Sequence, residues 1–107
     1  MANKFGRDIL IQAPDPTAAA RFYVEQLGFE ITNKTPYIIS LEGEKINLYI
    51  ERGPTLGPIF EVSVSDVDEA KQRLVENGCE IVKDEPDFPR CYVQDPHGLT
   101  YNLIKSK

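Results

Sequence analysis

Residues 20–31 have the sequence ARFYVEQLGFEI, and residues 70–81 have the sequence AKQRLVENGCEI. Alanine, glycine, glutamate and isoleucine recur in the two stretches at a constant spacing of fifty residues, and Val24 in the first is matched by Leu74 in the second. An internal repeat of this kind is typical of a chain built from two copies of one supersecondary unit. The 107 residues are therefore expected to form a single domain made of two similar modules.

Each copy contains the signals of one helix. In the first copy Asp15 precedes a proline: the carboxylate can accept a hydrogen bond from the first free backbone amides, and proline at the first helical position loses no bond. In the second copy Asp66, with Glu69 three residues later, resembles a capping box. Gly28 and Gly78 are expected to end the two helices, because glycine adopts the left-handed conformation at little steric cost.

Apolar runs and turn residues predict one strand before each helix and three strands after it. The expected strands span residues 8–13, 29–35, 37–42 and 45–51 in the first copy, and 59–64, 80–83, 90–94 and 99–104 in the second. The predicted fold is therefore α+β, with two tandem βαβββ modules whose curved mixed sheets surround a cleft. Module one comprises residues 1–52 and module two comprises residues 59–107. The linker between them, residues 53–58, is rich in glycine and proline and is expected to hold neither helix nor central strand.

Alternation along the strands separates two faces, because successive side chains point to opposite sides of a sheet. One face is apolar and is expected to meet the helices; it carries Ile9, Ile11, Ile46, Leu48, Ile50, Phe60, Val62, Val64, Cys91, Val93, Leu99, Tyr101 and Leu103. The opposite, mixed face carries Asp8, Leu10, Gln12, Asn47, Tyr49, Glu51, Ile59, Glu61, Ser63, Arg90, Tyr92, Gln94, Thr100 and Asn102.

The mixed face has two interpretations. It is either the solvated side of an antiparallel sheet or the wall of a cleft with aromatic surfaces and a few orienting polar groups. The repeat favours the cleft, since the aromatic and aliphatic members of this face would otherwise form an apolar patch in water. Those members are Leu10, Tyr49, Ile59 and Tyr92.

The charge balance excludes some classes of partner. Twelve Lys and Arg residues against seventeen Asp and Glu residues give a formal net charge of -5, so the chain lacks the basic surplus that binding to nucleic-acid phosphates requires. No apolar run approaches the length of about 20 residues that a membrane span needs. A cytoplasmic protein with reduced thiols is expected, in which Cys79 and Cys91 are buried small hydrophobes.

Two further motifs stand at matching places of the repeated chain. Residues 20–23, Ala-Arg-Phe-Tyr, lead into residues 27–29, Leu-Gly-Phe, and residues 95–98, Asp-Pro-His-Gly, precede the last predicted strand. Together with the doubled order of strand, helix and three strands, these motifs resemble the vicinal oxygen chelate superfamily, which includes glyoxalases, bleomycin resistance proteins and extradiol dioxygenases. The resemblance covers nearly the whole chain and implies the fold, but this superfamily hosts several functions.

In metal-dependent members of that superfamily, four ligands, usually His, Glu or Gln, project into the cleft from the first and last strands of each module. The matching positions here fall near Asp8 and at Asn47 in the first module, and near Ile59 and at Asn102 in the second. Isoleucine cannot bind a metal, and asparagine amides are weak ligands beside carboxylates and imidazoles. The chain is therefore similar in character to the metal-free, bleomycin-resistance-like branch, and no cofactor is expected.

Two alternatives to this metal-free interpretation remain open. Asp8, Glu51 and Glu61 are predicted on the mixed face, and three carboxylates would suit a hard divalent cation at a displaced site. His97 is the only histidine of the chain, so a histidine-dependent reaction would have to use it. In its predicted turn, the expected role of His97 is a hydrogen bond to the backbone or to solvent.

The sequence therefore favours a small-molecule-binding homodimer that sequesters its ligand. The acidic residues of the mixed face favour a cationic ligand, and tyrosines supply flat contact surfaces. The candidate ligand-binding residues are Asp8, Gln12, Asn47, Tyr49, Glu51, Glu61, Ser63, Arg90, Tyr92 and Asn102. One alternative is a metal-dependent lyase, isomerase or dioxygenase with displaced carboxylate ligands. Another is a module whose mixed face only makes a homodimer.

Overall fold

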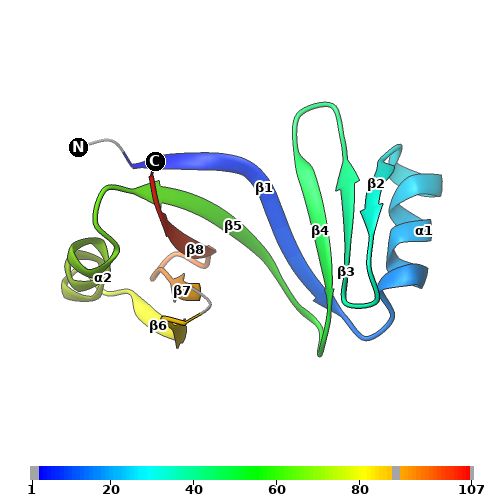
Figure 1. Ribbon diagram of the computed structural model, residues 1–107. Helices are drawn as coiled ribbons and strands as arrows, with labels where there is room; N and C mark the ends of the chain where they lie inside the picture. Colours follow the sequence, from blue (N-terminus) through cyan, green and yellow to red (C-terminus); the bar gives the residue numbers. More distant parts are fainter. Residues whose placement is uncertain (1–2, 88–89, 107) are drawn as a thin grey trace. The chain divides into compact units, whose positions relative to one another are not determined.

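The computed structural model describes residues 3–87 and 90–106, and the chain falls into two compact units (Figure 1). The N-terminal unit comprises Arg7–Pro58. The C-terminal unit comprises the described residues that follow Pro58, together with those that precede Arg7. Along the chain the order of strand, helix and three strands occurs twice, which confirms the predicted α+β fold of two tandem βαβββ modules.

In the N-terminal unit, a helix packs against a mixed sheet. The elements are β1 (Lys4–Ala13), which belongs to this unit from Arg7 onward, α1 (Pro16–Leu27), β2 (Glu30–Lys34), β3 (Ile38–Glu42) and β4 (Asn47–Arg52). The strands lie in the order β2-β3-β4-β1. β1 runs parallel to β4, whereas β3 is antiparallel to both of its neighbours. Figure 1 shows α1 beside the sheet, and it packs against β2, β3 and β4.

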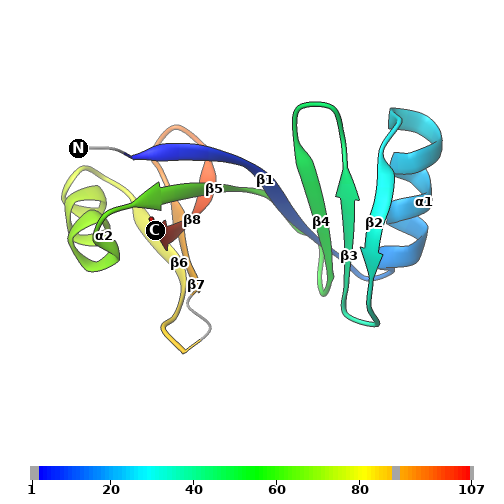
Figure 2. The same ribbon diagram turned by 45° about the horizontal axis from the view of Figure 1, so that its top comes forward.

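The C-terminal unit repeats this arrangement. Its elements are β5 (Leu56–Val64), α2 (Val67–Glu76), β6 (Glu80–Glu85), β7 (Arg90–Gln94) and β8 (Thr100–Lys105). The strands lie in the order β5-β8-β7-β6, with β5 parallel to β8 and the other neighbours antiparallel. α2 packs against β6 and β8, and Figure 2 shows it at one side of these strands.

Both predicted helix starts are confirmed. The Asp15 carboxylate accepts a hydrogen bond of 3.1 Å from the backbone N–H of Ala18, three residues into the helix. The Asp66 carboxylate accepts an equivalent bond of 3.1 Å from the backbone N–H of Glu69. In each case the side chain satisfies a backbone donor that has no partner within the helix, which fixes the residue where the helix begins.

Both helices are followed by a glycine in the left-handed conformation, as predicted, but the distance of that glycine from the helix end differs. Gly28 directly follows α1 and has a φ of 78°, as expected. α2 instead ends at an asparagine cap, Asn77, whose Nδ2 donates a hydrogen bond of 2.8 Å to the carbonyl oxygen of Arg73. Gly78 follows with a φ of 98°. Its left-handed turn therefore lies one residue beyond the helix end that the repeat predicts.

The first strand of each module is longer than predicted. β1 begins at Lys4 and not at residue 8, and β5 begins at Leu56 and not at residue 59. Three residues of the expected linker 53–58 are therefore extended strand. Gly57 makes this possible: its φ is 110°, and a Cβ atom at this position would lie 2.9 Å from the carbonyl oxygen of Leu10. The other strand boundaries differ from the expected ones by two residues or fewer.

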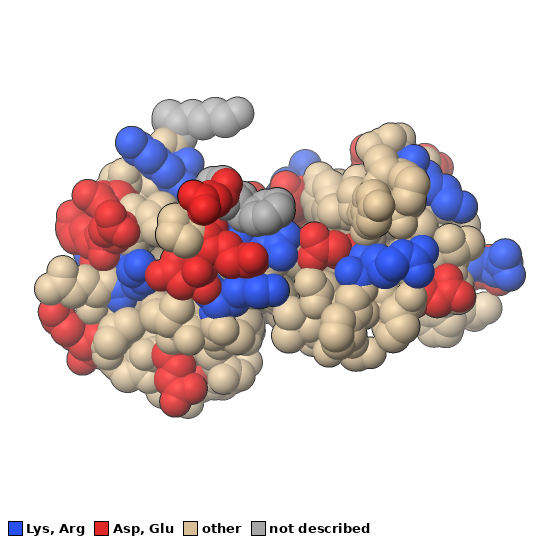
Figure 3. All heavy atoms as spheres, turned by 60° about the horizontal axis from the view of Figure 1, so that its bottom comes forward, with Lys and Arg blue, Asp and Glu red and all other residues tan. Residues whose placement is uncertain are grey.

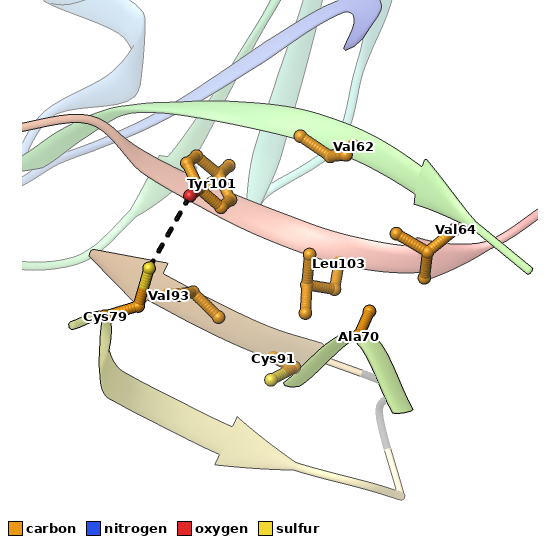
Figure 4. Packing of buried hydrophobic residues seen from close by; sticks show 8 residues of the cluster. All are labelled: Val62, Val64, Ala70, Cys79, Cys91, Val93, Tyr101 and Leu103. Carbon is orange, nitrogen blue, oxygen red and sulfur yellow. Dashed lines mark hydrogen bonds between the residues drawn. The ribbon is translucent and has the colours of Figure 1, made fainter. Parts of the chain in front are cut away.

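Each unit has its own hydrophobic core on the face predicted to be apolar. Helix and strand residues together make the N-terminal core, which comprises Ala20, Ile39, Leu41, Leu48 and Ile50, with Ile9 and Ile11 packed against it. The C-terminal core comprises Val62, Val64, Ala70, Cys79, Cys91, Val93, Tyr101 and Leu103 (Figure 4). The periodicity argument is thus confirmed for the strand residues that it had assigned to this face, whereas Ile39 and Leu41 of β3 join the core without having been predicted.

Two residues assigned to the apolar face lie outside both cores. Ile46 is 39% exposed and Leu99 is 42% exposed. Ile46 stands immediately before the first residue of β4, and Leu99 immediately before the first residue of β8. Side chains alternate only within a strand, so this alternation does not determine where the side chains of Ile46 and Leu99 point.

The two cysteines are buried and free, as expected. In Figure 4 the thiol of Cys79 points to the hydroxyl of Tyr101, at an S–O distance of 4.0 Å. Burial raises the pKa of the Cys91 thiol. Neither helix in the described part of the chain is long and apolar enough to cross a membrane.

Candidate functional site

In the N-terminal unit, the parallel pairing of β1 with β4 brings together five of the predicted site residues. The register places Asp8 opposite Asn47, Leu10 opposite Tyr49, and Gln12 opposite Glu51. Successive strand residues point to opposite faces, and the intervening residues belong to the core beneath α1. The five residues therefore share the face of the sheet that lies opposite α1. All of them are half-buried.

Two hydrogen bonds join acids to amides across this strand pair. Asn47 Nδ2 donates to Asp8 Oδ1 over 2.9 Å. Gln12 Nε2 donates to Glu51 Oε1 over 2.7 Å. Each amide holds its carboxylate partner in a defined position and neutralises none of its charge. The face therefore carries two oriented, half-buried carboxyl groups with the Tyr49 and Leu10 pair between them.

In the C-terminal unit, β5, β8 and β7 carry the other predicted residues. Asn102 lies opposite Glu61 on one side and opposite Tyr92 on the other. Ser63 lies further along β5, opposite Ile104. Asn102 Oδ1 accepts a hydrogen bond of 2.9 Å from the backbone N–H of Cys91, so the strand pair β7–β8 fixes the orientation of this amide.

Arg90 and Tyr92 form a second feature of this face. The guanidinium carbon of Arg90 lies 5.4 Å from the centre of the Tyr92 ring, in cation–π range. Arg90 Nη1 also lies 3.8 Å from Glu85 Oε1. Tyr92 is only 2% exposed, and so is Ile59. Both stand on the face predicted to be mixed, so that face is not simply the solvated side of a sheet.

The structure corrects the predicted correspondence between the two modules. Asp8 and Asn47 stand one residue before the core pair Ile9 and Leu48, and Glu61 and Asn102 stand one residue before the core pair Val62 and Leu103. The counterpart of Asp8 is therefore Glu61, whereas sequence reasoning chose Ile59.

The cause of the error is the spacing of the repeat. Asp8 and Glu61 are 53 residues apart, three more than the spacing that relates the two helices. A signal for the correct alignment was present in the strands themselves. The pattern of an acid followed by alternating apolar residues runs from Asp8 through Ile11 in the first module and from Glu61 through Val64 in the second.

The side chains at these four positions do not fit the divalent metal centre that the resemblance implies. Asn47 presents its amide nitrogen to the carboxylate of Asp8, and nitrogen of a carboxamide is not a metal ligand. The oxygen of Asn102 accepts a backbone N–H. Among the described residues, no group of three or more His, Cys, Asp and Glu side chains is placed to hold a metal ion.

His97 lies in the predicted turn and is exposed. Its backbone N–H donates a hydrogen bond of 2.9 Å to Asp95 Oδ1, which also accepts one of 3.1 Å from the N–H of Leu99. The residue therefore takes part in the turn through its backbone N–H, and the expected hydrogen bond of its imidazole stays a prediction. Figure 3 shows that acidic and basic side chains are interspersed over the face drawn there, without a continuous basic surface.

Comparison with known proteins identifies the fold. The model of the Glyoxalase/Bleomycin resistance protein/Dioxygenase superfamily matches residues 7–103. A hypothetical protein from Bacillus halodurans C-125 is similar over 100% of this chain and 96% of that chain, with a TM-score of 0.68 and 17% identity. A member of the same superfamily from Vibrio splendidus 12B01 is similar over 96% and 100% of the two chains, with a TM-score of 0.66 and 18% identity.

A further solved structure is an enzyme. A variant of homoprotocatechuate 2,3-dioxygenase from B. fuscum is 26% identical, with a TM-score of 0.63 over 99% of this chain and 34% of that chain. A search of the curated proteins gave no match. Because the family model covers nearly the whole length and the structures share the fold, the chain belongs to the Glyoxalase/Bleomycin resistance protein/Dioxygenase superfamily.

Proposed function

We propose that the protein binds a small organic cation on the faces of its sheets that lie opposite α1 and α2, without a resident metal. The observation that carries this proposal is the repeated acid and amide pair: Asp8 opposite Asn47 in one unit, and Glu61 opposite Asn102 in the other. A carboxylate at the same place in both modules, with an amide beside it and a tyrosine nearby, is a recognition pattern for a ligand that carries positive charge.

The electrostatics of the residues support a cationic ligand. Asp8 and Glu51 are half-buried, and each accepts a hydrogen bond from a neutral amide. A carboxylate that is partly removed from water attracts an opposite charge more strongly than an exposed one. The half-buried ring of Tyr49 would supply flat apolar contact for the body of the ligand.

The proposal includes a homodimer in the cytoplasm that sequesters its ligand and performs no reaction on it. A symmetric dimer is the commonest soluble oligomer. If the mixed face only formed a dimer interface and bound no small molecule, no ligand would change the stability of that dimer. Light scattering at micromolar protein concentration tests the dimer, and a monomer would contradict this part of the proposal.

One observation favours a second candidate, a metal-dependent lyase, isomerase or dioxygenase. In the observed register, the position of the second module that corresponds to Asp8 is a carboxylate, Glu61, whereas the sequence analysis placed Ile59 there. A cation held by displaced carboxylates would supply a Lewis acid that polarises a carbonyl or stabilises an enediolate. The identity of 26% with a dioxygenase points in the same direction.

Thermal unfolding of chelator-treated protein distinguishes the two candidates. The protein is heated with a panel of divalent metals and with a panel of small molecules that includes organic cations and their neutral isosteres. A species that binds only the folded state at a hundred times its dissociation constant stabilises it by about 2.7 kcal/mol. We expect stabilisation by an organic cation and none by Mn, Ni, Zn or Fe. Stabilisation by a metal alone would favour the enzyme.

A further inference from the structure

A cavity in the C-terminal unit lies on the side of the sheet that faces α2, away from the proposed ligand face. Its volume is about 280 Å³. Its walls are mostly apolar and come from the start of β1 and from β5, α2 and β8; they include Phe5, Val64, Leu74, Leu99 and Tyr101. A cavity of about 150 Å³ accommodates benzene. This cavity is therefore large enough for a molecule with one ring and a short side chain.

Three aromatic rings pack together at one side of the cavity, and two of them, Phe5 and Tyr101, belong to its wall. The ring of Phe5 stands nearly perpendicular to the rings of Phe60 and Tyr101, with centroid distances of 6.1 and 6.2 Å. Phe5 is nevertheless 59% exposed. Leu99, at another point of the cavity wall, is 42% exposed. The cavity therefore has an accessible apolar rim.

Asp95 is the charged residue of the cavity wall. Burial tends to raise the pKa of its carboxyl, but hydrogen bonds from the backbone N–H groups of His97, Leu99 and Gly98 outweigh this, so the pKa lies below its usual value. The group is therefore ionised at neutral pH. Within the described part of the chain no Lys or Arg side chain makes an ion pair with it.

We propose that this cavity is a second binding site, which takes a small organic ammonium ion with an apolar body of one ring. The ring occupies the apolar space between Phe5, Leu74 and Leu99, and the ammonium group lies near the carboxylate of Asp95. The chemistry is complementary in both parts: an apolar cavity receives the ring, and a carboxylate beside aromatic rings receives the cation.

The test uses 2-phenylethylammonium as the probe and follows backbone amide resonances of the intact protein by NMR. We expect saturable shifts at Val64, Leu99 and Leu103. The neutral isostere 2-phenylethanol should bind more weakly by about fivefold, the difference that one partly exposed charge pair supplies. Asp95→Asn keeps an oxygen for the turn and removes the charge, and it should weaken binding of the cation by the same factor while leaving binding of the alcohol unchanged.

Two further variants serve as controls. One does not alter the turn that Asp95 stabilises, and the other separates this cavity from the ligand face of the proposed function. Phe5→Ala removes an exposed part of the wall and should weaken binding of both probes. Glu61→Gln alters only the opposite face and should leave the shifts unchanged. The proposal is overturned if the alcohol binds as tightly as the cation, or if the shifts appear around Glu61 and Asn102 and disappear in Glu61→Gln.

Discussion

Asn47 donates a hydrogen bond of 2.9 Å to Asp8 across the parallel strands β1 and β4. An acid and an amide also face each other in the second module, where Glu61 lies opposite Asn102 across β5 and β8. An acid and an amide that only stabilise one sheet would not have to recur at the equivalent place of the other module. A pair that is kept at the equivalent place of both modules suggests a shared role, and its physical consequences can be tested one by one.

Asn47→Asp replaces the amide donor with a second carboxylate next to Asp8. Two like charges at this distance raise the pKa of the pair in the folded state above its unfolded value. The variant should therefore be less stable by about 1 kcal/mol at pH 7, and the loss should shrink as pH falls and the pair takes up a proton. Urea unfolding at pH 7 and pH 4 measures this. Asn33→Asp, on an exposed strand, is the control; an equal loss in both variants would contradict the explanation.

Asn102→Leu removes the oxygen that accepts the backbone N–H of Cys91. A polar group that loses its partner in a partly buried place costs about 1–3 kcal/mol. We expect a fall of this size in the free energy of unfolding, together with faster hydrogen exchange at the Cys91 amide. Asn33→Leu should change stability little. An unchanged exchange rate at Cys91 would show that the bond contributes nothing.

Gly57→Ala tests the unusual start of β5. The residue has a φ of 110°, and the added Cβ would lie 2.9 Å from the carbonyl oxygen of Leu10. We expect a loss of about 1–3 kcal/mol from backbone strain, with the steric contact adding to it. Gly28→Ala is the matched control, because φ there is 78° and nothing lies within 4 Å of the added atom. Equal losses in thermal unfolding would rule out a contribution from the contact.

Tyr101 gives a prediction at alkaline pH. Burial, followed by its hydrogen bond to Cys79, raises the pKa of the phenol to about 12. The unfolded state then loses its proton first, near the ordinary value of about 10. The stabilisation is present below that value and is lost as pH rises towards 12. Tyrosinate absorbance should show one late-titrating group that is missing in Tyr101→Phe; a wild-type titration identical to that of the variant would contradict this.

Sequence patterns predicted the parts of this structure that local physical chemistry controls. Asp15 and Asp66 cap the helices because the free amides at a helix start need acceptors. Val62, Val64 and Leu103 reach the core because side chains alternate along a strand.

Features that depend on contacts between distant residues were not predicted. The strand register decides that Glu61, and not Ile59, corresponds to Asp8. In the sequence, only the short pattern of an acid followed by apolar residues indicates that the strands of the two modules are further apart than the helices. The hydrogen bond from the Cys91 backbone N–H to the side-chain oxygen of Asn102 depends on how β7 and β8 pair. The start of β5 at Leu56 depends on a close approach of Gly57 to Leu10.

The proposed binding of an organic cation is tested by a calorimetric titration of chelator-treated protein with the organic cation that stabilises it most. Asp8→Asn and Glu61→Gln remove one charge each and keep the shape of the side chain, and Glu44→Gln removes an exposed charge as the control. We predict that each of the first two variants weakens binding by about fivefold and that Glu44→Gln leaves it unchanged. Equal affinity in all four proteins would contradict the claim that the repeated acid and amide pairs bind the ligand.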